Sequence, residues 1–166
     1  MKAKELRALQ KPLKEKYKEN PEEAEWILHA DGVLEKEIAC SVETDIGEVE
    51  AGLHPATGGD GSFACSGDML LQALVACAGV TLKSVATAMG IQINKGTVHA
   101  DGILDFRGTL GVSREVPVGF KEINLTFHLD TDAEAGKLEK LVELTERYCV
   151  VYQTLTNQLD VSTNLK

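Results

Sequence analysis

The sequence predicts an α+β fold, in which antiparallel sheets pack on one long central helix. The first observation is that the most apolar stretch, Ser66 to Gly90, carries its apolar residues at helical spacing. The second is that strand-like alternation occurs both before and after this stretch. The third is the order of elements, βββ-α-ββ-α-α-β, which offers few of the crossovers that a parallel sheet requires.

The central stretch predicts a helix of about 23 residues and about 35 Å. Ser66 suits the N-cap, Asp68 favours the positive end of the helix dipole, and Gly90 suits the residue after the last turn. A helix that is apolar round most of its circumference is normally buried. Its fully apolar run is nearer 12 residues than the roughly 20 of a membrane span, so we expect no membrane span.

The whole chain divides into two parts. We expect an N-terminal helical extension in residues 1–20, with a helix over 3–19 that Pro12 divides in two. The main domain then occupies residues 21–166. It begins with a three-stranded meander in residues 24–53: a strand at 26–30, a hairpin turn at Asp31-Gly32, a strand at 33–44 and another at 48–53. A glycine-rich loop, HPATGGDGSFACSGD, follows and suits either a pocket rim or a plain connection.

After the central helix the pattern returns to strands. Residues 91–108 predict one strand with a bulge at Gly102, and residues 120–129 predict a second, with Ile123 and Leu125 on its inward face. Thr131 and Glu134 fit a capping box for a helix over 132–148. A short helix at 150–157 and a last strand at 159–163 complete the prediction.

The composition limits the classes of function. The 166 residues carry a net charge of −9, which argues against nonspecific binding to nucleic acid or to an anionic membrane surface. The charged N-terminus has no apolar signal region, so we expect a cytoplasmic protein with reduced thiols. The four cysteines form no CxxC pair and none of the spacings of metal ligands, and we predict no metal site and no bound cofactor.

Two cysteines are candidates for chemistry. Cys77 lies in the middle of the central helix and Cys149 at the end of the 132–148 helix. A single buried cysteine is usually a packed, inert side chain. A pair is more informative, because a redox-active thiol often lies beside a resolving thiol.

The chain resembles the OsmC/Ohr family of osmotically inducible and organic hydroperoxide resistance proteins. The resemblance covers residues 24–166 and lies in HPATGGDG, DMLLQALVACAGVTLKSVATAMGI and ERYCVVYQTL. It implies an OsmC-like fold and an intertwined homodimer whose central helices pack together. It also implies a thiol-dependent peroxidase: the Cys77 thiolate attacks an organic hydroperoxide, the resulting sulfenate forms a disulfide with Cys149, and an external dithiol reduces that disulfide.

The sequence departs from the peroxidase members of this family at the activating groups. Those members carry an arginine in the N-terminal strands and a glutamate just before the central helix. This chain has no arginine between Arg7 and Arg107, and Ser66-Gly67 stand at the expected proline-glutamate. Lys36, His54 or an arginine of the partner's 107–114 region are the candidate substitutes.

Two functions therefore remain open. The first is the peroxidase, in which Leu74, Val80, Tyr148 and Tyr152 would form apolar walls around an alkyl tail. The second is a non-catalytic protein of the same fold that binds a small apolar or thiol-reactive ligand at the dimer interface, and a purely structural dimer is a third possibility. The role of residues 1–20 and the identity of substrate and reductant are left undetermined by the sequence.

Overall fold

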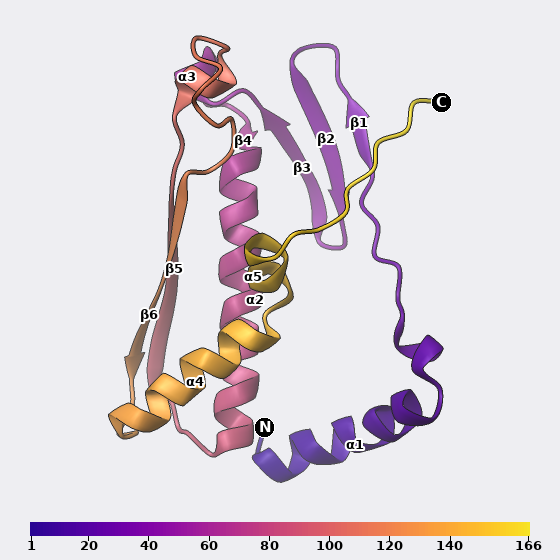
Figure 1. The fold of residues 1–166 in the computed structure, drawn as a ribbon, viewed down its shortest axis with the longest axis vertical. Coiled ribbons are helices and arrows are strands. Elements are labelled where there is room, and N and C mark those ends of the chain that lie inside the picture. Colours follow the sequence, from indigo (N-terminus) through magenta and orange to yellow (C-terminus); the bar gives the residue numbers. More distant parts are fainter. The chain divides into compact units, whose positions relative to one another are not determined.

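A computed structural model describes all of residues 1–166 (Figure 1). The elements are, in chain order, α1 (Ala3–Glu19), η1 (Pro21–Ala24), β1 (Gly32–Leu34), β2 (Ala39–Thr44), β3 (Gly47–Gly52), η2 (Pro55–Thr57), β4 (Ala64–Cys65), α2 (Ser66–Met89), β5 (Lys95–Ile103), α3 (Phe106–Thr109), β6 (Glu122–Asp130), α4 (Ala135–Tyr148) and α5 (Val150–Thr156). They form two compact units. The first unit comprises Met1–Glu15, Ala73–His99 and Thr126–Lys166, and the second comprises Lys16–Gln72 and Ala100–Leu125.

The second unit contains a four-stranded sheet in the order β1-β2-β3-β4. The first three strands are antiparallel, with Val42 opposite Val49 in the β2–β3 pair, and β4 pairs with β3 in parallel. Gly47 begins β3 with a φ of 140°, a conformation that glycine adopts without a side-chain clash, and this permits the tight β2–β3 turn. The three-stranded meander is therefore confirmed, although its first strand lies elsewhere than predicted.

The predicted strand at residues 26–30 is absent, and the predicted strand at 33–44 is two strands. Residues 25–31 pair with no other strand, and the Ile27 side chain is almost fully exposed. An alternating apolar and polar sequence forms a strand only where a partner strand is available. The chain turns at residues 35–38 instead of at Asp31-Gly32. The backbone N–H of Glu35 donates to the carbonyl of Ala39 at 3.1 Å, and the Ser41 hydroxyl donates to the Glu35 carboxylate at 2.9 Å.

The central helix has nearly the predicted bounds. α2 begins at Ser66 itself, so Ser66 is its first residue instead of a cap preceding it. Gly90 follows the last turn with a φ of 70°, and the N–H of Ile91 donates to the carbonyl of Ala86 at 2.9 Å, which is the Schellman closure expected of a glycine there. By length and composition alone, α2 could cross a membrane.

One stripe of α2 is buried within the chain. Its members recur every four residues: Leu74, Ala78, Leu82 and Ala86. In the core of the first unit, Leu82 and Ala86 pack with Leu141 of α4 and with Phe127 and Leu129 of β6. A Cβ added at Gly79 would lie 3.5 Å from Val98 of β5, so the β5–β6 sheet approaches α2 closely. The remainder of the circumference is only partly covered, which differs from the burial predicted for so apolar a helix.

The two long strands after α2 partly follow the prediction. Figure 1 shows β5 and β6 side by side as one long hairpin. Along β6 the side chains alternate as predicted, with Ile123 and Leu125 half-buried and Asn124 exposed. β5 ends at Ile103, however, and the short helix α3 replaces the end of the predicted strand. Gly102 makes room for an aromatic ring, because a Cβ there would overlap a ring carbon of Phe120.

Three further predictions about the helices and termini were wrong. α1 continues through Pro12, since proline removes one helical hydrogen bond without always ending the helix. The cap of α4 is Glu134, and no capping box forms because the Thr131 hydroxyl donates to the carbonyl of Gln92 at 2.6 Å. Residues 159–163 form no strand; they are exposed and lie beside no partner strand.

Candidate active site at Cys77 and Cys149

The first compact unit brings the two candidate cysteines together, although 71 residues separate them in the chain. Cys77 lies in the middle of α2 and Cys149 lies between α4 and α5. Their side chains lie close enough for each thiol to affect the pKa of the other. Both thiols are free, so the structure describes the reduced form of the pair.

The position of Cys149 is set by two helices at once. Its backbone N–H donates to the carbonyl of Thr145 at 2.9 Å and closes α4, while its sulfur accepts from the N–H of Tyr152 at 3.5 Å and caps α5. The last turns of α4 are themselves anchored, because Leu141 and Thr145 are buried and the Thr145 hydroxyl bonds back to the carbonyl of Leu141 at 2.7 Å. Cys149 is consequently 0% exposed, whereas Cys77 is half-buried.

The surroundings of Cys77 favour its thiolate. Burial acts to raise the pKa of this thiol, because a low dielectric disfavours the charged form. Four donors act against burial: the backbone N–H groups of Val151 and Val150, the thiol of Cys149 and the hydroxyl of Thr81. Together they hold the pKa of Cys77 below that of an ordinary thiol.

The surroundings of Cys149 act in the opposite direction. Burial raises the pKa of Cys149, and the neighbouring Cys77 raises it further, although the N–H of Tyr152 partly offsets both. Of the two thiols, Cys77 is therefore the one that loses its proton first, and Cys149 is the one that keeps its proton to higher pH. This order suits Cys77 as the attacking sulfur and Cys149 as the thiol that would later attack it.

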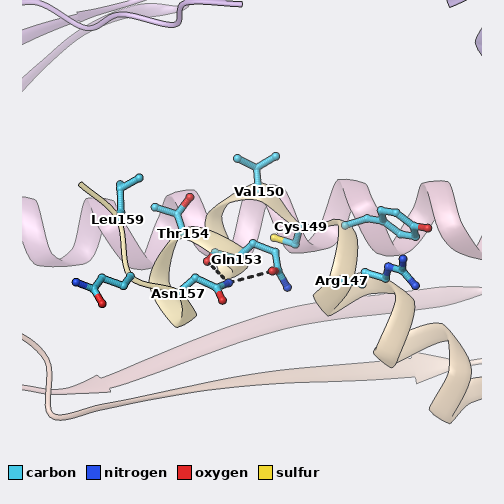
Figure 2. Close-up of a pocket in the computed structure, with 9 residues that line it drawn as sticks. Arg147, Cys149, Val150, Gln153, Thr154, Asn157 and Leu159 are labelled. Atoms are coloured by element: carbon cyan, nitrogen blue, oxygen red, sulfur yellow. Dashed lines mark hydrogen bonds between the residues drawn. The ribbon is translucent and has the colours of Figure 1, made fainter. Parts of the chain in front are cut away.

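An open pocket of about 410 Å³ lies along the α4–α5 junction beside Cys149 (Figure 2). Its lining includes Arg147, Tyr148, Val150 and Leu159. The Arg147 guanidinium lies 5.5 Å from the centre of the Tyr148 ring, a cation–π arrangement. Among the predicted apolar walls, Tyr148 lines this pocket, whereas Leu74 is buried in the core and Val80 is 73% exposed on α2.

The candidate substitutes for the family arginine have other partners or stay exposed. Arg107 donates to both carboxylate oxygens of Asp105, and this contact lowers the pKa of Asp105 to about 2. The His54 ring stacks on Phe106 at 4.9 Å, and its Nδ1 accepts from the N–H of Ala56. Lys36 and Arg114 are exposed.

Thr81 is among the groups that act to lower the pKa of Cys77, and the sequence interpretation did not single it out. The one available signal was its position four residues after Cys77, which places the two side chains next to each other on a helix. The chain also contains no group of three or more His, Cys, Asp or Glu side chains that could hold a metal ion.

Residues 59–164 match the family model described as OsmC-like protein. The match covers more than half of the chain and includes both cysteines. The chain belongs to the OsmC-like family. The predicted resemblance is therefore confirmed. Among curated proteins, no sequence matches this OsmC-like protein.

Solved structures agree with the family assignment at the level of the fold. An OsmC-like protein from Mycoplasma pneumoniae superposes with a TM-score of 0.67 at 19% identity, covering 79% of this chain and 88% of that one. An organic hydroperoxide resistance protein OsmC from Legionella pneumophila superposes with a TM-score of 0.62 at 18% identity, and the match covers 80% of this chain and 92% of that one. An organic hydroperoxide resistance protein from Elizabethkingia anophelis also has a TM-score of 0.62, at 16% identity, and the match covers 80% of this chain and 91% of that one. The α+β prediction is confirmed, and α2 is the long central helix of this OsmC-like fold.

Proposed function

We propose that this OsmC-like protein is a thiol-dependent peroxidase that reduces organic hydroperoxides. The observation that carries the proposal is the pair of neighbouring thiols within one compact unit, in which the pKa of Cys77 is lowered and that of Cys149 is raised. A peroxide-reducing thiol must be ionised to attack, and a resolving thiol must be close enough to form a disulfide. The names of the Legionella and Elizabethkingia proteins, which refer to hydroperoxide resistance, also support it.

The reaction follows from the two protonation states. The Cys77 thiolate attacks the terminal oxygen of ROOH, the O–O bond breaks, and the alkoxide leaves as ROH after taking up a proton. Cys149 holds the nearest proton, so donating it to the alkoxide would also turn Cys149 into a thiolate. That thiolate attacks the Cys77 sulfenic acid, a Cys77–Cys149 disulfide forms, and the hydroxide that leaves takes up a proton from solvent to become water. An external dithiol then reduces the disulfide, and no bound cofactor is required.

The protein acts as a homodimer in this proposal. α2 exposes a row of apolar residues that its own chain does not cover, including Ala73, Ala76 and Val80. An apolar helix face of this kind is normally buried against another helix. A second copy of α2 would supply that cover, and we place the protein in the cytoplasm, where reducing conditions keep both thiols free.

The chain would comprise two parts in this protein. We assign residues 1–20 to an N-terminal helical extension and residues 21–166 to the OsmC-like domain. α1 has no buried residue, and the Lys16 ammonium forms an ion pair with Glu23 just beyond it, which supports an extension lying outside the core.

The alternative is a non-catalytic protein that binds a small apolar or thiol-reactive ligand near Cys77. It is favoured by one observation: all the groups that act to lower the pKa of Cys77 are uncharged, and no guanidinium is among them. In this case Cys77 would contact the bound ligand, and the protein would catalyse no reaction.

One experiment separates the two functions. Reduced protein is titrated with cumene hydroperoxide, and free thiols and remaining peroxide are counted. The peroxidase converts two thiols per subunit into one disulfide for each equivalent, and Cys77→Ser abolishes peroxide consumption. Cys65→Ser, a control at another half-buried cysteine, consumes peroxide like wild type. Equal, slow consumption by wild type and Cys77→Ser would rule out the peroxidase and leave the binding function.

A further inference from the structure

The charge of this chain is divided unevenly between α1 and the residues that follow it. Residues 1–19 hold seven of the 17 lysines and arginines and three of the 26 acidic residues, so they carry a net charge of +4. Residues 20–166 carry −13. The net charge of −9 argues against binding to an anionic surface through the protein as a whole, but it includes one strongly basic helix.

Two rows of side chains run along α1, one basic and one apolar. The basic row recurs at alternating steps of three and four residues, which keeps it on one side of the helix. Its members are all exposed: Lys4, Arg7, Lys11, Lys14 and Lys18. Within this row only Lys11 has a carboxylate within ion-pair distance, that of Glu15 at 3.8 Å. The apolar row consists of Leu6, Leu9, Leu13 and Tyr17.

The apolar row of α1 is left largely uncovered by the rest of the chain. α1 has no buried residue, and Leu9 and Leu13 remain 60% and 49% exposed. An exposed helix with leucines on one side and lysines and arginines on another has the pattern of helices that lie in the surface of a bilayer.

An anionic bilayer surface satisfies both rows at once. Its headgroups attract the lysines and arginines, and the apolar layer beneath them accepts the leucines. A nucleic acid would also attract the basic row, but it offers the leucines no apolar layer. We propose that α1 binds the surface of a membrane that contains anionic phospholipids, with Leu9 and Leu13 inserted below the headgroups. The acidic remainder of a second copy is the rival partner for the basic row, and it predicts no binding to vesicles.

The acidic residues that follow α1 do not prevent this contact. Charges are screened over about 8 Å at physiological ionic strength. Residues 25–31, between η1 and β1, pair with no strand, and a segment of this length spans up to about 23 Å when extended. That reach is nearly three screening lengths, which is enough to hold the β1–β4 sheet outside the range of strong repulsion.

The experiment measures co-sedimentation of the full, reduced chain with vesicles in the absence of hydroperoxide. We expect binding to phosphatidylcholine vesicles that contain phosphatidylserine and none to phosphatidylcholine alone. Binding should be lost as salt rises from about 0.1 to 1 M, which shortens the screening length from about 10 to 3 Å. Lys11→Gln with Lys14→Gln should weaken binding about 25-fold, because each basic residue near an anionic surface strengthens it about fivefold. Leu9→Gln should weaken it about tenfold, because less apolar surface is inserted.

Two controls make the same changes outside α1. Lys137→Gln with Lys140→Gln removes two exposed lysines three residues apart on α4, one of them ion-paired as Lys11 is. Leu110→Gln replaces a leucine that is exposed to a similar degree as Leu9. Both controls should bind like wild type, and far-UV circular dichroism identifies the variants that keep their helices. If wild type does not sediment with phosphatidylserine vesicles, or if the α4 variant loses as much affinity as the α1 variant, the inference is wrong, whether or not the protein reduces hydroperoxides.

Discussion

The Cys149 sulfur accepts the backbone N–H of Tyr152 at 3.5 Å, and Cys149 is the single residue that both ends α4 and caps α5. The same sulfur lies beside Cys77 and affects its pKa. The resolving thiol of the proposed reaction is therefore part of the backbone architecture of two helices. Any chemistry that changes the Cys149 sulfur also changes the acceptor of the Tyr152 N–H. Two substitutions at Cys149 can separate these roles.

Cys149→Ser should remain well folded, and Cys149→Ala should lose about 1 kcal/mol of unfolding free energy relative to it. A serine hydroxyl can still cap α5, whereas alanine cannot. Urea unfolding under reducing conditions measures the difference. With one equivalent of hydroperoxide, both variants should accumulate a Cys77 sulfenic acid that dimedone traps, whereas wild type should yield the disulfide. Equal dimedone labelling of wild type and Cys149→Ser would contradict the resolving role.

The stability contributed by the thiol pair should pass through a maximum as pH rises. The folded pKa of Cys77 is lowered, so its contribution is present above the unfolded pKa and is lost as pH falls through the folded pKa. The folded pKa of Cys149 is raised, so its contribution is present below the unfolded pKa and is lost as pH rises through the folded pKa. Urea unfolding at a series of pH values, with reductant present, measures both the rise and the fall of the unfolding free energy. Cys77→Ser should remove the rise, and an unchanged rise in that variant would show that Cys77 does not cause it.

Leu141→Ala should destabilise the protein by about 2–5 kcal/mol, the range measured for leucines deleted from well-packed cores. Leu141 is 0% exposed and packs with Leu82 and Ala86 in the core that positions the end of α4. Leu9→Ala, at an exposed leucine on α1, is the control and should change the unfolding free energy by less than about 0.5 kcal/mol. Similar losses in both variants would mean that the core lies elsewhere.

Gly102→Ala should destabilise the protein by about 1–3 kcal/mol, because its Cβ would overlap the Phe120 ring. Adding Phe120→Ala should make the glycine substitution nearly neutral in a double-mutant cycle. Gly136→Ala is the contrasting control, since α4 offers open space there and alanine favours a helix. We expect this control to be neutral or slightly stabilising. A Gly102→Ala protein as stable as wild type would show that the ring can move aside freely.

Val80→Glu should shift the protein from dimer to monomer in sedimentation velocity experiments. Val80 is 73% exposed on the uncovered face of α2, and a carboxylate buried between two such helices would have no partner. Leu110→Glu introduces the same charge at an exposed leucine outside α2 and should leave the dimer intact. A dimer that persists in Val80→Glu would mean that another surface forms the interface.

The sequence predicted those parts of the fold that depend on local pattern. The apolar run from Ser66 to Met89, ended by Gly90, needs no distant contact to be recognised as a helix. The alternation in β6 was equally clear, because one face of that strand contacts the core. The errors arose where a pattern depended on a partner. Residues 26–30 and 159–163 alternate but have no neighbouring strand, and Thr131 bonds to Gln92, a residue 39 positions away.

The candidate site was predictable only in part, for the same reason. Cys77 and Cys149 were paired through the family resemblance, since no rule of spacing brings two residues so far apart in the chain into contact. The donors around Cys77 could not be foreseen, because two of them are backbone N–H groups of Val150 and Val151. The hydroxyl of Thr81 was equally ambiguous, since most helical threonines bond to their own helix.

The uncharged surroundings of Cys77 have a consequence for the conditions under which it can react. A thiolate held by a distant cation would lose part of that support as salt rises, because mobile ions screen charges over about 8 Å at physiological ionic strength. Here the groups that act to lower the pKa of Cys77 are a hydroxyl, a thiol and two backbone amides, all of them uncharged. We therefore expect the pKa of Cys77 to change little when the ionic strength of its surroundings changes.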